Sequence, residues 1–549
     1  MKNWLSGSFS RRHFLTLAGM AAAAAACGKA EARLVELAAA VKEKKDRPVV
    51  VIGAGLGGLT AAAYLVRAGF PVTVVEQHDV PGGYATSFDR LAGRYTFEVS
   101  LHQTAATGTI TEQILRELGL WGKVPLVPVP ELARIITPDF DLTLPAANPQ
   151  GCIEVLAKQF PQEKQGIAAF INEMLEISRE TNSLPVRMGL WDYVTFPIRH
   201  SLLWDIRKLT LAQMLDRHVK DPKLKSLLSL FWGYYGLPPS ELSGFYYAVA
   251  TASYLKHGGY YYQPRAQALS NALADMIQAK GGEVIFETET EGILLKDDAV
   301  SGVRLKGGKI LPAKAVIAGG SAPDLFGKML APQALPADYQ AKLASYRPSI
   351  SSFLVWLGLK EEIRGRITGY GVSLKEGYDP EAEYQACLAA DAAKVSLGVA
   401  LYDNLFAGYS KPGTSTLAII FTCGYQPWRR FEADYLAGRK KAYHQEKNRL
   451  ARILVERVEK RLIPGLSGMI EVMEAATPLT NLRYTKNPQG AIYGYEQSVA
   501  NAFMDRIKER TPVKGLYLAS AWGNPGGGYT GVQIGGRNAF MKLMEDWAD

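Results

Sequence analysis

The stretch that decides the fold reads Val49-Val50-Val51-Ile52-Gly53-Ala54-Gly55-Leu56-Gly57-Gly58. Its first four residues are β-branched and follow a proline, which predicts a buried parallel strand. Glycines follow at once. Gly53 allows a tight turn, Gly55 lets the backbone approach a pyrophosphate, and Gly58 lets the next helix pack closely on the strand. The stretch therefore predicts a strand, a glycine-rich turn and a helix whose N-terminus binds phosphate groups.

The residues after this turn complete a dinucleotide-binding unit. A helical pattern runs from Leu59 to Ala68, Gly69 ends it, and residues 72–75 read as a second strand that leads into Glu76. A carboxylate at this position is placed to accept hydrogen bonds from ribose hydroxyls. We expect a dinucleotide to contact the following residues: Gly53, Gly55, Gly57, Gly58 and Glu76.

A second glycine pair follows directly. Residues 77–88 read QHDVPGGYATSF, with Gly82 and Gly83 just beyond the ribose-binding acid. The segment resembles flavoproteins of the amine oxidase and phytoene desaturase superfamily, which carry such a pair at this place. The resemblance implies that the dinucleotide is FAD and that Gly82 and Gly83 approach it closely.

The C-terminal end repeats the strand, turn and helix pattern. Residues 515–520 read as a strand, residues 521–531 form a glycine-rich turn, and a helix is expected from Val532 onward. A positive helix end stabilises negative charge beside it. In the superfamily this segment closes over the isoalloxazine ring, near the flavin N1–C2 carbonyl region, so helix polarity there tunes the flavin. We expect Gly527, Gly528, Gly531 and Val532 to contact the flavin.

The rest of the nucleotide domain is expected between the two ends. Residues 268–280 show helical periodicity, and strands are expected at 283–286, 289–295, 300–305 and 310–318. In the superfamily layout, a residue at Thr290 contacts the adenine, mainly through its backbone. The family usually has Val at that position.

The middle of the chain is unusually aromatic. The aromatic residues between 187 and 262 either form a packed helical core or line a cavity for a long apolar ligand. They are Trp191, Tyr193, Phe196, Trp204, Phe231, Trp232, Tyr234, Tyr235, Phe245, Tyr246, Tyr247, Tyr254, Tyr260, Tyr261 and Tyr262. Residues 187–210 interleave apolar residues with Arg199, Arg207 and Lys208, a pattern that also suits a membrane surface. Further strands are expected at 350–359, 397–402 and 415–422, and a solvated amphipathic helix at about 430–462.

Taken together, the chain resembles the phytoene desaturase, carotenoid isomerase and retinol saturase group from about residue 48 to 546. Residues 97–102 (FEVSLH), 476–481 (ATPLTN) and 487–494 (NPQGAIYG) carry the likeness. Glu98 and Ser100 replace the Asp and Gly usual in the first segment. The fold implied is α/β, a Rossmann-like FAD-binding domain of the GR2 type interleaved with an α+β substrate domain. The expected segments are 1–27 (export signal), 28–46 (linker), 47–100, 265–340 and 471–549 (FAD domain), and 101–264 and 341–470 (substrate domain).

The resemblance implies an FAD-dependent oxidoreductase of the desaturase or saturase type. It would act on a carbon–carbon bond of a long apolar substrate, isoprenoid or carotenoid-like. Alternatives are a redox-neutral carotenoid cis–trans isomerase, a flavin amine oxidase and a non-enzymatic flavin-binding protein. The flavin performs the hydride step, and the protein must handle one proton. Candidates for that proton are Tyr529, His102 and Tyr493.

The N-terminal segment has the pattern of a targeting signal. Residues 10–15 (SRRHFL) precede a short apolar stretch, which resembles a twin-arginine export signal. Export predicts a periplasmic or other extracytoplasmic enzyme, and Cys27 is a candidate for lipid attachment. Because NAD(P)H is a cytoplasmic pool, membrane quinones or oxygen are the expected electron partners.

Composition limits the remaining classes. The chain has 549 residues, 48% hydrophobic and 21% charged, with a net charge of +9, part of it in the N-terminal segment. No block of like charge occurs, which argues against a nucleic-acid partner. Four scattered cysteines (Cys27, Cys152, Cys387, Cys423) have no metal-type spacing, so we expect no metal site and no disulfide framework.

Overall fold

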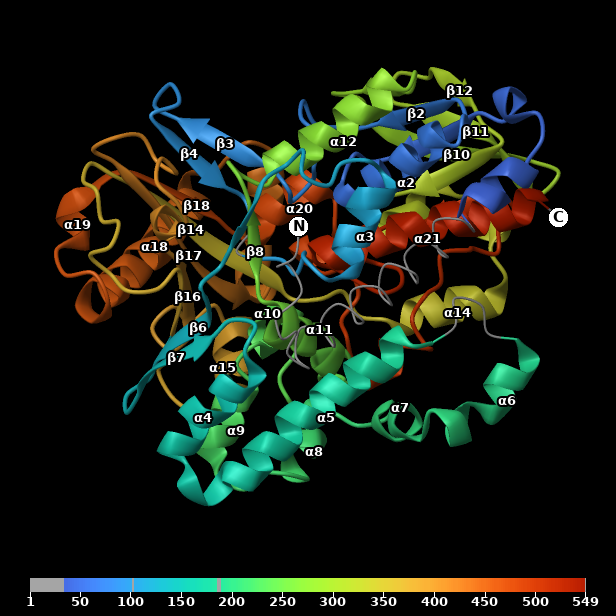
Figure 1. The fold of residues 1–549 in the computed structure, drawn as a ribbon. Coiled ribbons are helices and arrows are strands. Elements are labelled where there is room, and N and C mark those ends of the chain that lie inside the picture. Colours follow the sequence, from blue (N-terminus) through green and yellow to red (C-terminus); the bar gives the residue numbers. More distant parts are fainter. Residues whose placement is uncertain (1–33, 101–102, 185–188, 549) are drawn as a thin grey trace, which may run out of the picture.

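The computed structural model describes residues 34–100, 103–184 and 189–548. The expected export signal, Cys27 and His102 therefore lie outside the described residues. Two sheets organise the chain, a five-stranded parallel sheet and a seven-stranded mixed sheet, and Figure 1 shows them side by side. In the described part of the chain, no helix is both long and apolar enough to cross a membrane.

The parallel sheet contains the expected N-terminal strands. Its order is β19-β13-β1-β2-β9, and every neighbouring pair is parallel. All four residues of β1 are buried, as a strand covered on both faces requires. The sheet packs with three helices, α2, α12 and α21 (Figure 1). The bounds are β1 (Val49–Ile52), β2 (Val72–Val75), β9 (Glu283–Ile285), β13 (Ala315–Ala318), β19 (Leu516–Leu518), α2 (Leu56–Arg67), α12 (Gln267–Ala279) and α21 (Tyr529–Ala548).

A three-stranded antiparallel sheet adjoins it, formed by β10 (Thr290–Lys296), β11 (Ala299–Leu305) and β12 (Ile310–Pro312). The expectation of one strand over 310–318 is wrong, because β12 ends at Pro312 and β13 begins at Ala315 in the other sheet. Proline cannot donate a ladder hydrogen bond, so it suits the end of β12. The chain crosses from one sheet to the other at Ala313 and Lys314.

The seven-stranded sheet has the order β18-β14-β17-β16-β15-β6-β7, and only the β15–β6 pair is parallel. Its strands are β6 (Glu131–Ile136), β7 (Asp141–Pro145), β14 (Ser351–Leu359), β15 (Gly371–Leu374), β16 (Leu397–Ala400), β17 (Ser415–Cys423) and β18 (Ile470–Ala476). Strand β18 joins this sheet, although residues 471–549 are expected in the FAD domain. The chain returns to the parallel sheet only at β19.

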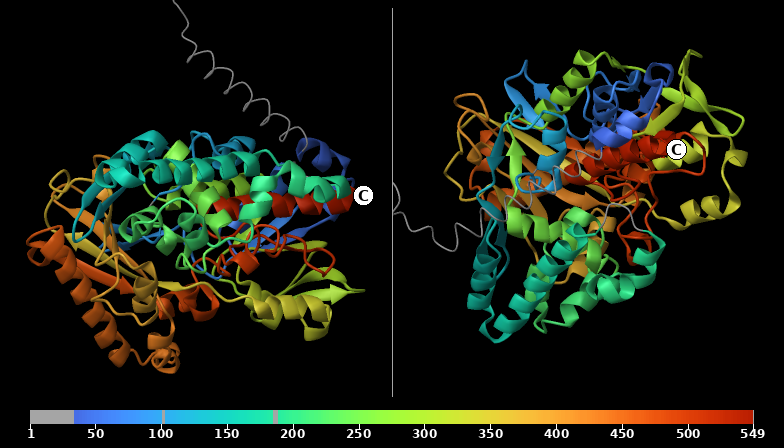
Figure 2. Two further views of the ribbon diagram at one scale, coloured as in Figure 1. Left: turned by 90° about the horizontal axis from the view of Figure 1, so that it is seen from below. Right: turned by 45° about the vertical axis from the view of Figure 1, so that its right-hand side comes forward.

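Strand β14 shows how this sheet is covered on both faces. Phe353 packs against Phe421 of β17 and Trp428, on the side of α18 (Lys441–Arg461). The alternate residues Leu354 and Trp356 belong to the core around β1 and line a cavity. In Figure 2 (left), α18 and the teal helices α4 (Pro149–Gln159) and α5 (Lys164–Asn182) lie on opposite sides of the sheet.

The helix expected over about 430–462 is interrupted. Helix α17 (Glu432–Leu436) ends before α18 begins at Lys441. Gly438, with φ of 81°, stands between them in the left-handed region, which a continuous helix does not admit.

The remaining elements are short. They are the pairs β3 (Ser87–Arg90) with β4 (Tyr95–Glu98) and β5 (Leu126–Pro128) with β8 (Tyr260–Tyr262), and the helices α3 (Ile110–Glu117), α6 (Leu190–Arg199), α7 (Ser201–Ile206), α8 (Leu211–Asp216), α9 (Pro222–Leu228), α10 (Trp232–Tyr235), α11 (Gly244–His257), α13 (Ala322–Asp324), α14 (Ala337–Ser345), α15 (Pro380–Leu388), α16 (Gln426–Arg429), α19 (Leu466–Met469) and α20 (Pro478–Thr485).

The described part of the expected linker packs onto the body of the protein. Residues 34–40 are helical, and Leu34, Ala38 and Val41 are buried in the same core as β1 and α2. The segment is therefore structured where it is described.

Candidate active site

A cavity of about 2410 Å³ extends from the parallel sheet to the seven-stranded sheet. Both glycine-rich turns, the start of β10 and the helices around α10 and α11 contribute to its wall. Nearly all the residues expected to bind a dinucleotide therefore face one space. They are Gly53, Gly55, Gly57, Glu76, Gly82, Gly83, Thr290, Gly527, Gly528, Gly531 and Val532. Gly58 packs behind the turn instead.

The N-terminal turn is built by backbone contacts. Gly53 has φ of +90°, in the left-handed region. A Cβ atom on Gly58 would lie 2.2 Å from the Gly53 carbonyl oxygen, so only glycine allows the helix to pack this closely on the strand. Gly55 is the N-cap of α2, where no side chain caps the helix, and a Cβ there would meet nothing within 4 Å. The helix N-terminus is thus open toward the cavity, as anion binding requires.

The second glycine pair lies against this turn. The Gly82 N–H donates to the Ala54 carbonyl at 2.7 Å, and Gly55 and Gly82 form a parallel bridge. Gly82 and Gly83 have φ of 128° and 62°, which favours glycine at both positions. The loop after β2 and the turn after β1 therefore form one glycine-lined surface.

Two side chains on this surface have free hydrogen-bonding capacity. The Glu76 carboxylate accepts from the Ala54 N–H at 2.7 Å and the His78 N–H at 2.9 Å, and its oxygens have further lone pairs. Thr290 is 5% exposed, and its Oγ1 has no partner among the described residues. An unpaired buried hydroxyl is costly, and a ligand in the cavity would satisfy it. Glu76 and Thr290 thus fit a nucleotide.

The C-terminal turn differs from expectation at one point, because α21 begins at Tyr529 and not at Val532. Gly528, with φ of 83°, makes the turn immediately before the helix, and the Val532 N–H already donates to the Gly528 carbonyl at 3.0 Å. Val532 is therefore inside the first helical turn. Gly527, Gly528, Gly531 and Val532 all line the cavity as expected of neighbours of a flavin.

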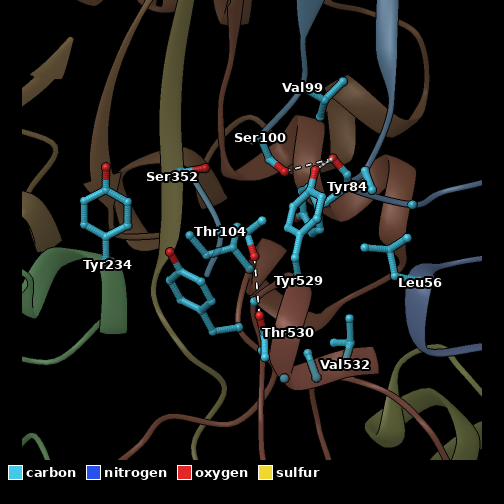
Figure 3. A pocket seen from close by; sticks show the side chains of 18 of the residues that line it. Leu56, Tyr84, Val99, Ser100, Thr104, Tyr234, Ser352, Tyr529, Thr530 and Val532 are labelled. Atoms are coloured by element: carbon cyan, nitrogen blue, oxygen red, sulfur yellow. Dashed lines mark hydrogen bonds between the residues drawn. The ribbon is translucent and has the colours of Figure 1, made fainter. Parts of the chain in front are cut away.

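Glycines also bring the two helices together. A Cβ on Gly57 would lie 2.1 Å from the Ala519 carbonyl oxygen and 3.1 Å from that of Val532, and one on Gly536 would lie 2.3 Å from the Gly57 oxygen. Helices α2 and α21 therefore touch backbone to backbone. Figure 3 shows Leu56 and Val532 on the same side of the cavity.

Side chains hold the start of α21 in place. The Thr530 hydroxyl lies 2.9 Å from that of Thr111 and donates to the Ala105 carbonyl at 3.3 Å. Deeper in the helix, Arg537 forms a buried bidentate ion pair with Glu117 of α3, at 2.9 and 3.0 Å. Figure 3 shows the further link between Thr104 and Thr530.

The tyrosines expected to handle a proton face this space. Tyr529 lines the cavity and donates to the Tyr84 carbonyl at 3.4 Å, close to Ser100 (Figure 3). Burial, followed by the charge of Glu98, raises the pKa of Tyr529 well above its usual value. Tyr493 also lines the cavity, and burial raises its pKa. Both phenols are therefore protonated near neutral pH.

Glu98 is a buried acid whose role the sequence did not indicate. Its Oε2 accepts from the Tyr261 hydroxyl at 2.5 Å and the Ala266 N–H at 3.0 Å, while its Oε1 has no partner in the described chain. Burial raises its pKa to about 7, although these hydrogen bonds and Arg265 oppose the rise. The signal in the sequence was its place in the segment 97–102, where Glu98 replaces the usual Asp.

Aromatic side chains form the wall away from the glycine turns. Those lining the cavity include Phe231, Trp232, Tyr234, Tyr235, Phe245, Tyr246, Tyr254, Trp356, Tyr370 and Phe421. Tyr247, Tyr261 and Tyr262 are core residues, and Trp191 is exposed. Both interpretations of the aromatic run thus hold, each for different residues.

Within the described residues, no group of three or more His, Cys, Asp or Glu is arranged to hold a metal ion. The thiols of Cys152, Cys387 and Cys423 are free and buried.

Comparison with known proteins shows which family this chain is similar to. The family model described as flavin containing amine oxidoreductase matches residues 56–539. Human all-trans-retinol 13,14-reductase is 26% identical, covering 87% of this chain and 82% of that protein. The chloroplastic prolycopene isomerase of Arabidopsis thaliana is 24% identical over 90% of this chain and 82% of its own length.

Solved structures show the same fold. Putrescine oxidase with putrescine bound has a TM-score of 0.60 at 16% identity, covering 91% of this chain and 98% of that one. Cyclohexylamine oxidase from Brevibacterium oxydans has a TM-score of 0.58 at 18% identity, with the same coverage. These likenesses concern the fold alone.

Proposed function

Since the chain belongs to the family of flavin containing amine oxidoreductases, we propose that this FAD-dependent oxidoreductase acts on a carbon–carbon bond of a long apolar, isoprenoid-like substrate. The carrying observation is the cavity, which continues from the glycine turns to an aromatic wall. Its volume of about 2410 Å³ exceeds the roughly 300–1000 Å³ of ordinary small-molecule sites, so it has room for a cofactor and a long ligand together. The relatives named after retinol and prolycopene support an isoprenoid substrate.

Bound FAD supplies a hydride acceptor or donor at its N5 position. In this proposal the open N-terminus of α2 binds the pyrophosphate, Glu76 accepts from the ribose hydroxyls, and Thr290 lies at the adenine. The N-terminus of α21 would face the isoalloxazine, and its positive end would stabilise negative charge there. The orphaned Thr290 hydroxyl and the glycine surface around Gly55 support this fit.

The chain's own residues would position the substrate, exclude water and hold the proton. The aromatic wall keeps a reacting carbon in an apolar space that turns toward the C-terminal glycine turn. Tyr529 and Tyr493 hold protons at their hydroxyl oxygens, because burial raises both pKa values. His102 remains a third candidate from sequence.

Anaerobic mixing of the FAD-loaded enzyme with candidate polyenes tests this reaction. For a desaturase, the substrate bleaches the oxidised flavin. For a saturase, the pre-reduced flavin regains its absorbance as the polyene loses a double bond. In a parallel assay in air, peroxide release with amines and oxygen, without binding of any polyene, would overturn the proposal in favour of an amine oxidase.

A redox-neutral isomerase is the second candidate. Its support is the prolycopene isomerase group, which is similar to this chain over a comparable length. In the same experiment an isomerase changes the polyene spectrum and leaves the flavin spectrum at its starting state.

We also propose that the enzyme is exported in folded form and exchanges electrons with quinones or oxygen. The support is the sequence Ser10-Arg11-Arg12-His13-Phe14-Leu15. A double Arg11→Lys, Arg12→Lys variant should stay in the cytoplasm on cell fractionation, and unchanged export would contradict the signal. Rapid flavin reduction by NADPH would contradict the electron partners.

The helix α6 supports contact with a membrane surface. Trp191, Val194 and Ile198 are exposed on it, beside Arg199. Exposed apolar side chains flanked by cations suit an anionic bilayer interface. Sedimentation with anionic vesicles should weaken several-fold in an Ile198→Ser variant, and equal binding of that variant would count against α6.

A further inference from the structure

A buried ion pair lies on the wall of the cavity. Lys375 follows β15 directly, and Glu383 lies in the first turns of α15. The Lys375 Nζ donates to Glu383 Oε2 at 2.9 Å, and the two side chains are only 2% and 13% exposed. Both residues line the cavity. The pair is therefore a charged group in contact with the space proposed for the substrate.

Stability alone does not account for the pair. Removing two charges from water is costly, and an apolar pair of similar volume is often as stable. Helix α15 does not need Glu383 as a cap, because the Asp379 side chain already accepts from the Glu381 and Ala382 N–H groups. We therefore look for the role of the pair in its position on the cavity wall.

The pair also has unused hydrogen-bonding capacity. An ammonium group has three donors, and Lys375 uses one of them on Glu383 in the described structure. The second carboxylate oxygen of Glu383 retains acceptor capacity. A group that both donates and accepts would complete the pair.

The cavity wall also carries the polar side chains of Ser373, Ser396 and Thr422. Trp232 of the aromatic wall packs against Tyr384, the neighbour of Glu383. Lys375 follows a strand of the seven-stranded sheet, whereas the glycine turns follow strands of the parallel sheet. The pair and the glycine turns therefore belong to different parts of the cavity wall.

We propose that Lys375 and Glu383 form a subsite for a hydroxyl group at the far end of the substrate. The hydroxyl would accept from the Lys375 ammonium and donate to the Glu383 carboxylate. A hydrocarbon end would leave the pair without a third partner, and a carboxylate end would be repelled by Glu383. This inference rests on the proposed function and specifies the substrate as an isoprenoid alcohol rather than a hydrocarbon.

Binding to the FAD-loaded enzyme tests the subsite independently of turnover. The probes are all-trans-retinol, the same polyene with a methyl in place of the hydroxymethyl end, and the corresponding acid. Dissociation constants come from quenching of tryptophan fluorescence. We expect the wild-type enzyme to bind the alcohol about 10- to 100-fold more tightly than the hydrocarbon, since a lost hydrogen bond to a charged group has that effect.

The double variant Lys375→Met, Glu383→Gln removes both charges and keeps the volumes similar. It should bind alcohol and hydrocarbon within about threefold of each other, with hydrocarbon affinity at least as high as in the wild type. Glu383→Gln alone should lose part of the preference and be less stable than the double variant, because it leaves the buried Lys375 ammonium without a counter-charge. Lys394→Met is the matched control, because Lys394 forms an exposed ion pair with Asp391 and is 77% exposed.

The outcomes separate the two proposals. If no polyene binds to the wild type, the proposed function fails. If the polyenes bind but the wild type shows no preference for the alcohol, or the double variant retains that preference, the subsite is refuted and the proposed function stands. A loss of preference in the double variant but not in the control supports the subsite.

Discussion

Two glycine-rich turns face the same cavity, and they are held in position by different means. In the N-terminal turn, Gly57 and Gly58 stand where a Cβ would lie 2.1 and 2.2 Å from backbone oxygens. In the C-terminal turn, a Cβ on Gly528 would meet nothing within 4 Å, and the helix start is fixed by hydroxyls such as that of Thr530. Close backbone packing thus sets the first turn, within the turn at Gly58 and against the distant Ala519 at Gly57, whereas the second turn is also held by side chains from other segments.

The largest expected effect breaks the first turn. Gly57→Ala places a methyl group against the Ala519 carbonyl, and neither backbone can yield without separating α2 from the segment that follows β19. We expect a loss of about 3 kcal/mol or more in the free energy of unfolding, with little bound FAD. Urea unfolding measures the free energy of unfolding, and the flavin-to-protein absorbance ratio measures the bound FAD. Gly55→Ala is the control. It should keep the stability but weaken FAD binding, since its methyl faces the open side of the turn.

A smaller expected effect is the pH dependence of stability that Glu98 brings to the C-terminal turn. Glu98 acts on the C-terminal turn, because its charge raises the pKa of Tyr529. Its own pKa is raised to about 7, so the folded protein binds the proton more tightly than the unfolded chain. The Glu98 contribution to stability is therefore present at low pH and is lost as pH rises through about 7.

The Glu98→Gln variant should lose this pH dependence of stability. The free energy of unfolding of the variant minus that of the wild type should therefore rise by about 2 kcal/mol as the pH goes from roughly 5.5 to 8. Urea unfolding at several pH values measures it. Tyr261 and Arg265 face the same carboxyl. If Tyr261→Phe showed the same loss of pH dependence as Glu98→Gln, the titrating group would not be Glu98 itself.

The smallest effect concerns the hydroxyl links of the second turn. Thr530→Val keeps the shape and removes the contacts with Thr111 and Ala105. We expect about 1 kcal/mol of lost stability and a several-fold weaker affinity for FAD. Thermal unfolding and FAD titration of the apoprotein measure these. An unchanged FAD affinity would mean that other contacts, such as the Arg537–Glu117 pair and the Gly57–Gly536 packing, position α21 without the Thr530 hydroxyl.

The same contrast explains what the sequence could predict. Strands β1 and β2 lie at the residues expected, because glycines and β-branched residues fix them locally. The start of α21 was placed three residues too late, since nothing local reveals that Tyr529 and Thr530 are inside the helix. The parallel pair β15–β6 joins segments more than two hundred residues apart, beyond the reach of periodicity.

The candidate site divides in the same way. Glycines and Glu76 were visible in motifs, and they line the cavity. Glu98 and the Lys375–Glu383 pair were not visible, because their burial comes from tertiary packing around otherwise ordinary charged residues.

The close approach of Gly57 to Gly536 has a consequence for biosynthesis. A ribosome makes the first half of this contact early and the second half only near the end of translation. Throughout that interval the nascent chain has an unfinished nucleotide fold, in which first β1 lacks its neighbour β13 and then β13 lacks its neighbour β19. Cofactor capture must therefore follow release of nearly the whole polypeptide, so a shortened translation product would be a flavin-free protein.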